Sequence, residues 1–345
     1  LDLILKKRLG QCIDWSRIDK YAYLYLYDAR DRVCAKKLPG NGWVKMVYDD
    51  ADRLVLSQDG VQSSRGESTF YLYDIHGRQC VSGVCSRNIS LREMVPTVVK
   101  AEYAGQDGPL AGYTSSGLSL VSPQVMSASY YDDYAFLEDF STGLPCGQSL
   151  YGSPIPSTMG RQTGSCQHVM GESIGSELVW NLVRYDQRGR VAHSEISYPD
   201  GGWSVEDVEY DFLGNPVHQH RAHRKNTVSP SIGEDLSYTY DHASRLLDVT
   251  HSLNGGTPVV VASNSYDELG RLSGTERGVS PSLSSSYSYN VRSWITEIGG
   301  PLFGEILHYE DPRPGSSPGT PGLFGGGVSS MEWRASGDAG MRSYD

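Results

Sequence analysis

Hydrophobic and polar positions alternate in many short stretches of the chain. Ahead of Asp28, the tyrosines of residues 21–27 alternate with Ala22, Leu24 and Leu26. A two-residue period places the tyrosines on one face of an extended strand and the aliphatic side chains on the other. Residues 236–240 repeat this pattern. No apolar run approaches the roughly 18 residues of a membrane-spanning helix, so the pattern predicts a series of short strands.

A motif follows these stretches at regular intervals. The dipeptide Tyr-Asp occurs nine times, and eight sites, counting Tyr289-Asn290, share a six-residue frame of Tyr, Asp, two variable residues, often Gly, and usually Arg. Six of the seven intervals between these sites are 21 to 30 residues long, which is typical of stacked supersecondary units. Tyr131-Asp132 lies outside the frame and is interpreted as a coincidence. Tyr344-Asp345 would begin a ninth unit.

The motif has a physical interpretation as a hairpin turn. The Asp in second place can accept hydrogen bonds from backbone N–H groups two residues on, and the Gly in fifth place suits a positive φ. Asp31, Asp52, Ser244 and Ser293 occupy that fifth place where Gly is absent. The Arg in sixth place opens the return strand, and we expect it to stack on the Tyr or pair with the Asp of its own motif.

These motif residues are therefore assigned structural roles. They are Tyr27, Asp28, Arg32, Tyr48, Asp49, Arg53, Tyr73, Asp74, Gly77, Arg78, Tyr185, Asp186, Gly189, Arg190, Tyr210, Asp211, Gly214, Tyr240, Asp241, Arg245, Tyr266, Asp267, Gly270, Arg271 and Tyr289.

The recurring Tyr-Asp-x-x-Gly-Arg-[Val/Leu] frame resembles that of the YD-repeat proteins, also called RHS-repeat proteins. The resemblance covers residues 20–85 and 181–295, and extends more loosely over the remaining segments. It implies an all-β fold in which tandem hairpins form an extended spiralling sheet, part of an RHS-type β-shell. Bacterial RHS-like proteins, Tc-toxin shell components and teneurins are the relatives that it suggests, and the chain looks like a fragment of such a protein.

The resemblance also implies a function. A shell of this family encloses or presents a C-terminal effector or toxin module, so the expected partner is that module in the same parent chain or a component of a secretion system. Secretion or association with the bacterial cell envelope, and no catalysis or cofactor, are expected. The alternative is a cell-surface adhesin that binds glycans or partner proteins through tyrosine and arginine, in which case Tyr21, Tyr23, Tyr25, Tyr238 and Tyr287 should be exposed.

The repeats divide the chain into four segments. Residues 1–85 hold three repeats, and residues 86–180 form an irregular Gly/Ser/Pro-rich insertion with some strands. Residues 181–300 hold five repeats, and residues 301–345 form a Pro/Gly-rich connection to the truncated next repeat. One short helix or strand is expected around residues 176–183.

Composition and net charge limit which partners and which metal sites the chain can have. Tyr (23 residues) far exceeds Phe (6), only 38% of residues are hydrophobic, and the net charge is −11. Such a charge argues against nucleic acid as a partner, because phosphate binding requires a basic surface. The six cysteines, Cys12, Cys34, Cys80, Cys85, Cys146 and Cys166, lack zinc-site spacing and are predicted to be isolated thiols.

Three groups of residues are candidates for a catalytic or metal-binding site. Ser173 lies in Gly-x-Ser-x-Gly, the pattern of a hydrolase nucleophile, but residues 315–319 match it as well, which favours coincidence. His218, His220 and His223 are weak metal candidates, since the first two would share a strand face. Asp132, Asp133, Glu138 and Asp139 form an acidic cluster, for which a solvated edge is the preferred interpretation.

Overall fold

The computed structural model describes residues 21–147, 151, 157–169, 178–278, 283–338 and 340–344. These residues form two compact units. Unit 1 comprises Leu1–Gln148, Ser153–Trp203 and Lys225–Thr227, and unit 2 comprises Ser149–Gly152, Ser204–Arg224 and Val228–Asp345. The boundary between them falls inside the block of repeats at residues 181–300. Among the described residues, no helix is both long and apolar enough to cross a membrane.

Unit 1 is an antiparallel sheet with a covering layer. Its strands are β1 (Leu24–Tyr27), β2 (Val33–Lys37), β3 (Trp43–Tyr48), β4 (Leu54–Gln58), β5 (Ser68–Tyr73), β6 (Gln79–Cys85), β9 (Gln124–Asp132), β10 (Thr158–His168), β11 (Leu178–Tyr185) and β12 (Val191–Ser197), and each pairs with the next in this order. The separate hairpin of β7 (Lys100–Tyr103) and β8 (Tyr113–Ser116) contacts β5. Short helices are α3 (Gly60–Arg65), η1 (Gly105–Asp107) and α4 (Phe136–Asp139).

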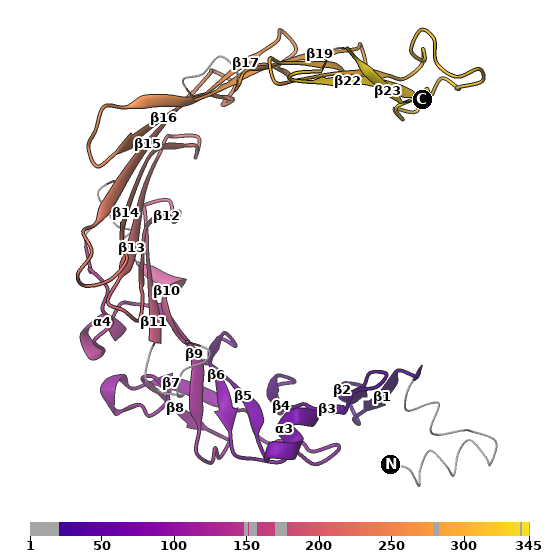
Figure 1. The fold of residues 1–345 in the computed structure, drawn as a ribbon. Coiled ribbons are helices and arrows are strands. Elements are labelled where there is room, and N and C mark those ends of the chain that lie inside the picture. The colour runs from indigo at the N-terminus through magenta and orange to yellow at the C-terminus, as the bar shows by residue number, and fades with distance from the viewer. Residues whose placement is uncertain are drawn as a thin grey trace, which may run out of the picture. The chain divides into compact units, whose positions relative to one another are not determined.

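Unit 2 begins within β13 (Trp203–Tyr210), and the elements with described bounds in it are strands joined by turns and irregular loops. The strands are β14 (Pro216–Arg224), β15 (Ile232–Tyr240), β16 (Leu246–Leu253), β17 (Val259–Tyr266), β18 (Leu272–Arg277), β19 (Ser285–Tyr289), β20 (Ile295–Gly299), β21 (Phe303–His308), β22 (Ser330–Ala335) and β23 (Arg342–Tyr344). Each of β14 to β23 pairs antiparallel with the next, so the strands follow chain order (Figure 1). The prediction of an all-β chain built from tandem hairpins is confirmed.

Each motif forms the same hairpin turn. All eight fifth-place residues have positive φ, and they are Asp31, Asp52, Gly77, Gly189, Gly214, Ser244, Gly270 and Ser293. In seven hairpins the first-place Tyr pairs with the residue after the sixth place, and a bulge shifts the register just before it, as in Tyr266 with Leu272. The turn is therefore a tight turn closed by a left-handed residue and a bulge, which is a common hairpin geometry.

Ser244 offers a test of this conformation. A side chain at φ 58° is strained, because the left-handed region costs an L-residue about 1–2 kcal/mol. Glycine at this position would remove the strain, but the greater conformational entropy of glycine in the unfolded chain offsets part of that stabilisation. We expect Ser244→Gly to raise the free energy of unfolding by about 0.5–1 kcal/mol in urea titration, whereas Ser244→Ala should not. An unchanged or lowered stability of the glycine variant would contradict the turn assignment.

The hydrophobic core lies in unit 1, on the sheet face opposite the motif tyrosines. Strand positions one and three residues before a motif Tyr carry fully buried members of this core: Leu72 and Phe70 precede Tyr73, and Leu182 precedes Tyr185. Residues 86–147 cover this face and contribute side chains such as Ile89, Val95, Val99, Leu110, Tyr113 and Phe136. The insertion is thus the second layer of the core, and its strand β9, together with β10, continues the sheet.

Unit 2 differs at the same positions. Ser263 and Ser265 precede Tyr266, and Ser286 lies three residues before Tyr289. No apolar side chain is buried among the described residues of unit 2. Apolar side chains are buried only in unit 1, where residues 86–147 cover the sheet, which explains why composition alone indicated a lean core.

The three short helices were not predicted, and one expected element is different. The helix considered around residues 176–183 is strand β11 in its described part, Leu178 onward. Helix α3 has a capping box in which Asp59 accepts from the backbone of Gln62, and the Gln62 side chain accepts from the backbone of Asp59. The Asp-x-x-Gln spacing was a readable signal for it.

Candidate functional site

The second-place Asp organises each motif turn. In the turn that follows Tyr240, Asp241 Oδ1 accepts hydrogen bonds from Ala243 N (2.8 Å) and Arg245 N (2.9 Å), while Oδ2 accepts from Arg245 Nε (2.6 Å). The same three bonds recur at Asp267, with Leu269 N and Arg271. Pairing of the Arg with the Asp of its own motif is therefore present as predicted.

The Arg, however, does not stack on its own Tyr. Its guanidinium lies over the Tyr of the following motif: Arg32 over Tyr48 at 4.7 Å, and Arg245 over Tyr266 at 4.7 Å. Arg53 over Tyr73 and Arg271 over Tyr289 are equivalent. The expectation of stacking within one motif is wrong, because the strand that the Arg opens pairs directly with the strand that ends at the Tyr of the next repeat, as β16 does with β17.

The stacked Tyr also hydrogen-bonds back to the previous repeat. Tyr266 Oη donates to the carbonyl of Leu246 at 2.9 Å, and Tyr289 Oη to that of Leu272 at 2.8 Å. In each case the acceptor is the residue after the sixth place of the previous motif. We call this pair of contacts, Arg over Tyr and Tyr hydroxyl to carbonyl, the repeat junction. It ties a hairpin to the next at Tyr48, Tyr73, Tyr266 and Tyr289, in addition to the strand pairing. At Tyr240, where the previous motif has Asn215 in place of Arg, only the hydroxyl bond to Pro216 O is present.

Two tyrosines outside the predicted set form the same contacts. Arg78 lies 4.4 Å from the ring centre of Tyr131, and Tyr131 Oη donates to Gln79 O at 3.1 Å. Tyr131-Asp132 is thus part of the repeat system, and its interpretation as a coincidence is wrong. Tyr309 Oη donates to Ile295 O at 2.7 Å, with Trp294 in the place of the Arg. The dipeptide at 131–132, near the middle of the 112-residue interval, was the available signal.

The motif carboxylates have lowered pKa values. The backbone N–H and the guanidinium of Arg245 lower the pKa of Asp241 to about 2, and the guanidinium of Arg78 lowers that of Asp132 to about 2. At Asp28, Asp49, Asp186 and Asp267, burial raises the pKa, but hydrogen bonds from the motif Arg outweigh it and the pKa is lowered. The environments of these six carboxylates therefore favour the ionised form.

This predicts acid sensitivity. Because the folded pKa lies below the value near 3.9 of an unfolded Asp, the stabilisation is complete above about pH 4 and is lost as the pH falls toward 2. We expect the melting temperature, followed by circular dichroism, to drop steeply between pH 4 and 2. A melting temperature that stays constant down to pH 2 would contradict the role given to these carboxylates.

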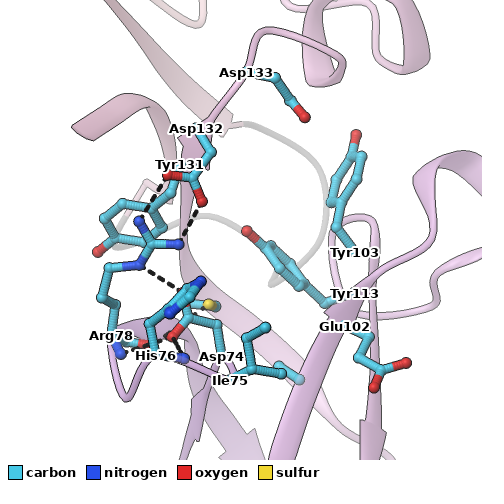
Figure 2. A pocket seen from close by; sticks show the side chains of 12 residues that line it. Asp74, Ile75, His76, Arg78, Glu102, Tyr103, Tyr113, Tyr131, Asp132 and Asp133 are labelled. Atoms are coloured by element: carbon cyan, nitrogen blue, oxygen red, sulfur yellow. Dashed lines mark hydrogen bonds and ion pairs between the residues drawn. The ribbon is translucent and has the colours of Figure 1, made fainter. Parts of the chain in front are cut away.

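A pocket of about 290 Å³ opens beside the Tyr73 turn. Its lining comes from that turn, from the β7–β8 hairpin and from the end of β9, and Figure 2 shows Arg78 and Asp132 across from Tyr103 and Tyr113. Arg78 is held by Asp74 (Nε–Oδ2 2.6 Å) and by both oxygens of Asp132 (2.9 and 2.5 Å). One wall of the pocket is therefore a repeat junction.

The other groups at the pocket are also engaged. Tyr103 Oη donates to Asp139 Oδ2 (2.7 Å), and Tyr113 Oη donates to Ser129 O (2.8 Å). Burial raises the pKa of both phenols, and it raises that of the Cys80 thiol to about 11. Phenols and thiol therefore stay protonated at neutral pH. The Tyr113 bond holds the β7–β8 hairpin against β9, and the Tyr103 bond joins that hairpin to α4.

Three residues of the predicted acidic cluster have hydrogen-bond partners at or near this pocket. Asp132 binds Arg78, Asp139 accepts from Tyr103, and Asp133 Oδ1 accepts from Ala135 N at the start of α4 (3.0 Å).

The three histidines of β14 have separate partners. His218 Nδ1 lies 3.1 Å from Ser237 Oγ, His220 Nδ1 lies 2.6 Å from Asp235 Oδ1, and His223 Nδ1 lies 2.8 Å from Ser204 Oγ. Strand alternation places His223 on the face opposite His218 and His220. Within the described ranges, no three His, Cys, Asp or Glu side chains are grouped so that they could hold a metal ion.

Ser173 and Cys12 lie outside the described residues. The other five cysteines are free thiols, of which only Cys146 is exposed. Residues 315–319, the second match to the hydrolase pattern, form turns around Gly315 and Gly319, both at positive φ.

Comparison with known proteins gives a remote likeness. No family model and no curated protein matches the chain. Among solved structures it is similar to "Crystal Structure of TcdB2-TccC3", with 10% sequence identity and a TM-score of 0.29 over 99% of this chain and 17% of that chain. It is also similar to "Crystal Structure of TcdB2-TccC3-Cdc42", with 11% identity and a TM-score of 0.27 over 93% and 19%. The chain spans less than a fifth of the structures it resembles.

Proposed function

We propose that this chain is a segment of a structural β-sheet wall that encloses or presents a C-terminal effector or toxin module of its parent protein, and that the segment is not itself catalytic. The repeat junction is the observation that carries the proposal. Of the polar residues that recur most regularly, Asp organises the turn of its own hairpin, and Arg and Tyr join one hairpin to the next. Such repetition extends a sheet by addition of identical units.

The mechanism is mechanical. A wall built this way leaves few unpaired strand edges along its length, because every inner strand is paired on both sides. The junctions add side-chain contacts across each pair of hairpins, so an opening must break stacking and hydrogen bonds together with the strand ladder. Secretion or attachment to a cell envelope, and a secretion-system partner, belong to the same proposal.

Protection of the module tests this proposal. The parent polypeptide would be digested with protease at neutral pH, native and with Asp241→Ala plus Asp267→Ala. We expect the downstream module to be cleaved at least tenfold faster in the variant, because both turns lose their organising carboxylate. Glu268→Ala, at an exposed position of the same turn, is the matched control and should behave as native. Equal cleavage in all three proteins, or a parent without such a module, would end the proposal.

A surface adhesin is the second candidate, and one observation favours it. Tyr21, Tyr23 and Tyr25 are 76%, 65% and 48% exposed, and aromatic faces of this kind stack on sugars. Tyr238 and Tyr287 are only partly exposed, and Tyr238 Oη donates to Gln219 Oε1 at 2.7 Å. Of these five tyrosines, the strongly exposed ones therefore lie at residues 21–25, just before and at the start of β1.

Glycan binding separates the two candidates. A glycan array probed with the chain should give signals that Tyr23→Ala plus Tyr25→Ala abolishes if the adhesin proposal holds, while Tyr238→Ala serves as the comparison at a half-buried position. An array without specific signals would remove the adhesin from consideration.

A further inference from the structure

One face of the unit 2 sheet carries small polar and acidic side chains. We call the side of strands β16 to β20 that lies opposite the motif tyrosines the serine face. Directly paired residues of an antiparallel ladder have their side chains on the same side of the sheet, and successive residues alternate between the two sides. By these rules the residues on the serine face include Ser265, Gly274, Glu276, Ser286, Ser288 and Glu297.

Three carboxylates stand at regular intervals on the serine face. Asp248 of β16 and Glu276 of β18 both pair with Ser263 of the strand between them, and Glu297 of β20 pairs with Ser288. The three therefore occupy every second strand. Because neighbouring strands lie about 4.8 Å apart, successive carboxylates are spaced by about 10 Å across the sheet.

The basic side chains lie on the other side. Arg277 pairs with Ala262 on the tyrosine side of β17 and β18. The guanidinium groups of Arg245 and Arg271 lie over the rings of motif tyrosines. Among the described residues of strands β16 to β20, no Lys or Arg lies on the serine face. The negative charge of this face is therefore not balanced by cations from its own strands.

The serine face is also hollowed. A hollow of about 510 Å³ has Ser265, Gly274, Glu276, Ser286 and Gly299 in its lining. An added Cβ would lie 2.8 Å from the Ser265 hydroxyl at Gly274, and 2.6 Å from the Ser286 hydroxyl at Gly299. Glycine inside a strand often marks a place where another backbone approaches closely. The floor of the hollow is main chain and hydroxyl groups, which can hydrogen-bond to a polypeptide.

The corresponding face of unit 1 shows what covers such a sheet. There, residues 86–147 pack on the side opposite the motif tyrosines, through apolar contacts. In unit 2, Ser265, Glu276, Ser286, Ser288 and Glu297 are exposed on that side. A polypeptide that covers the serine face therefore meets carboxylates and hydroxyls in place of an apolar surface.

We propose that the serine face binds an extended, lysine- or arginine-rich segment of a partner protein. Small cations need ligands that converge, and no three His, Cys, Asp or Glu side chains of the described part of the chain are grouped for a metal ion. An extended basic chain can instead meet Asp248, Glu276 and Glu297 one after another. Complementary charge of this kind selects the partner and fixes its register. The proposal is independent of whether the wall encloses a module.

A basic peptide tests this proposal. The probe is a fluorescent peptide of alternating lysine and serine that carries a photo-crosslinker, titrated against the full 345-residue chain in about 0.15 M salt, where distant charges are largely screened. We expect saturable binding that Glu276→Gln plus Glu297→Gln weakens at least fivefold, because two of the three carboxylates lose their charge. A peptide of alternating glutamate and serine should not bind.

The matched control removes the same charge from the opposite face. Glu234 pairs with Arg221, and Glu305 pairs with Ile298, both on the tyrosine side. Glu234→Gln plus Glu305→Gln should weaken binding less than twofold. Both double variants reduce the net negative charge by the same amount, so non-specific attraction of the peptide falls equally in the two.

Crosslink mapping completes the test. Crosslinks at Ser265, Ser286 or Ser288, in protein whose circular dichroism spectrum matches the native one, support the proposal. Equal weakening by the two double variants indicates adventitious attraction of a basic peptide to an acidic chain and overturns the proposal. Crosslinks confined to other residues, or no binding, overturn it as well.

Discussion

Replacing Phe70 by alanine should lower the free energy of unfolding of unit 1 by about 3–5 kcal/mol, the usual loss for a buried phenylalanine. The Phe70 side chain is 0% exposed and is part of the core cluster. It pairs across the sheet with Gly83, where an added Cβ would lie 2.8 Å from the Phe70 ring. Because the Phe70 ring fits this closely, its removal leaves a cavity that the neighbouring strands cannot fill. Urea unfolding followed by tryptophan fluorescence measures the effect.

Phe212→Ala is the matched control. Phe212 is 79% exposed on a turn of unit 2, so its removal should change stability by no more than about 0.5 kcal/mol. Equal effects of the two substitutions would show that unit 1 does not contain the buried layer described for residues 86–147.

Replacing Asp49 by alanine should cost about 3–5 kcal/mol, because it leaves a partly buried guanidinium without its counter-charge. Asp49 accepts from the backbone N–H groups of Ala51, Arg53 and Val99, and from the Arg53 side chain. Its loss therefore disturbs the turn and releases the segment at residues 95–99. Urea titration gives the stability, and hydrogen exchange at Val99 reports the release of the segment.

Asp50→Ala is the appropriate comparison. The Asp50 side chain is 52% exposed and pairs with Arg30, which is also exposed. An exposed ion pair contributes at most about 1 kcal/mol. A loss at Asp49 no larger than that at Asp50 would contradict the structural role assigned to the second place of the motif.

The hairpins could be predicted from the sequence because their determinants are local. Alternation sets the strands, the motif Asp caps the turn, and the fifth residue takes a positive φ. Even Ser244 and Ser293, which are unfavourable there, adopt it. Hydrogen bonds within the six residues of one motif determine this geometry, so the sequence of a single motif is enough to predict it.

The repeat junctions could not be predicted in the same way. Whether Arg245 reaches Tyr240 or Tyr266 depends on the register across two strands, which the spacing of the motifs does not reveal. The same limitation led to the dismissal of Tyr131, whose place in the sheet follows from the pairing of β9 with β6. Irregular chain separates it from the preceding motif, so no local rule connects the two.

The sequence indicates less directly that residues 86–147 cover the sheet of unit 1. Phe70, Leu72 and Leu182 stand where unit 2 has serine, and this contrast marks which repeats carry a second layer. This contrast can be recognised only when strand positions are counted back from the motif Tyr. The candidate pocket likewise depends on the position of the β7–β8 hairpin, which no residue pattern in the insertion specifies.

Arginine joins one repeat to the tyrosine of the next, and a double-mutant cycle isolates this contact. The cycle combines Arg245→Ala with Tyr266→Ala, and a parallel cycle combines Arg245→Ala with Tyr240→Ala, each followed by urea unfolding. Cation–π contacts contribute about 0.5–1 kcal/mol at partly exposed sites, and cycles isolate such pairwise coupling. We predict a coupling of that size between Arg245 and Tyr266 and none between Arg245 and Tyr240. Coupling to Tyr240 alone would contradict the account.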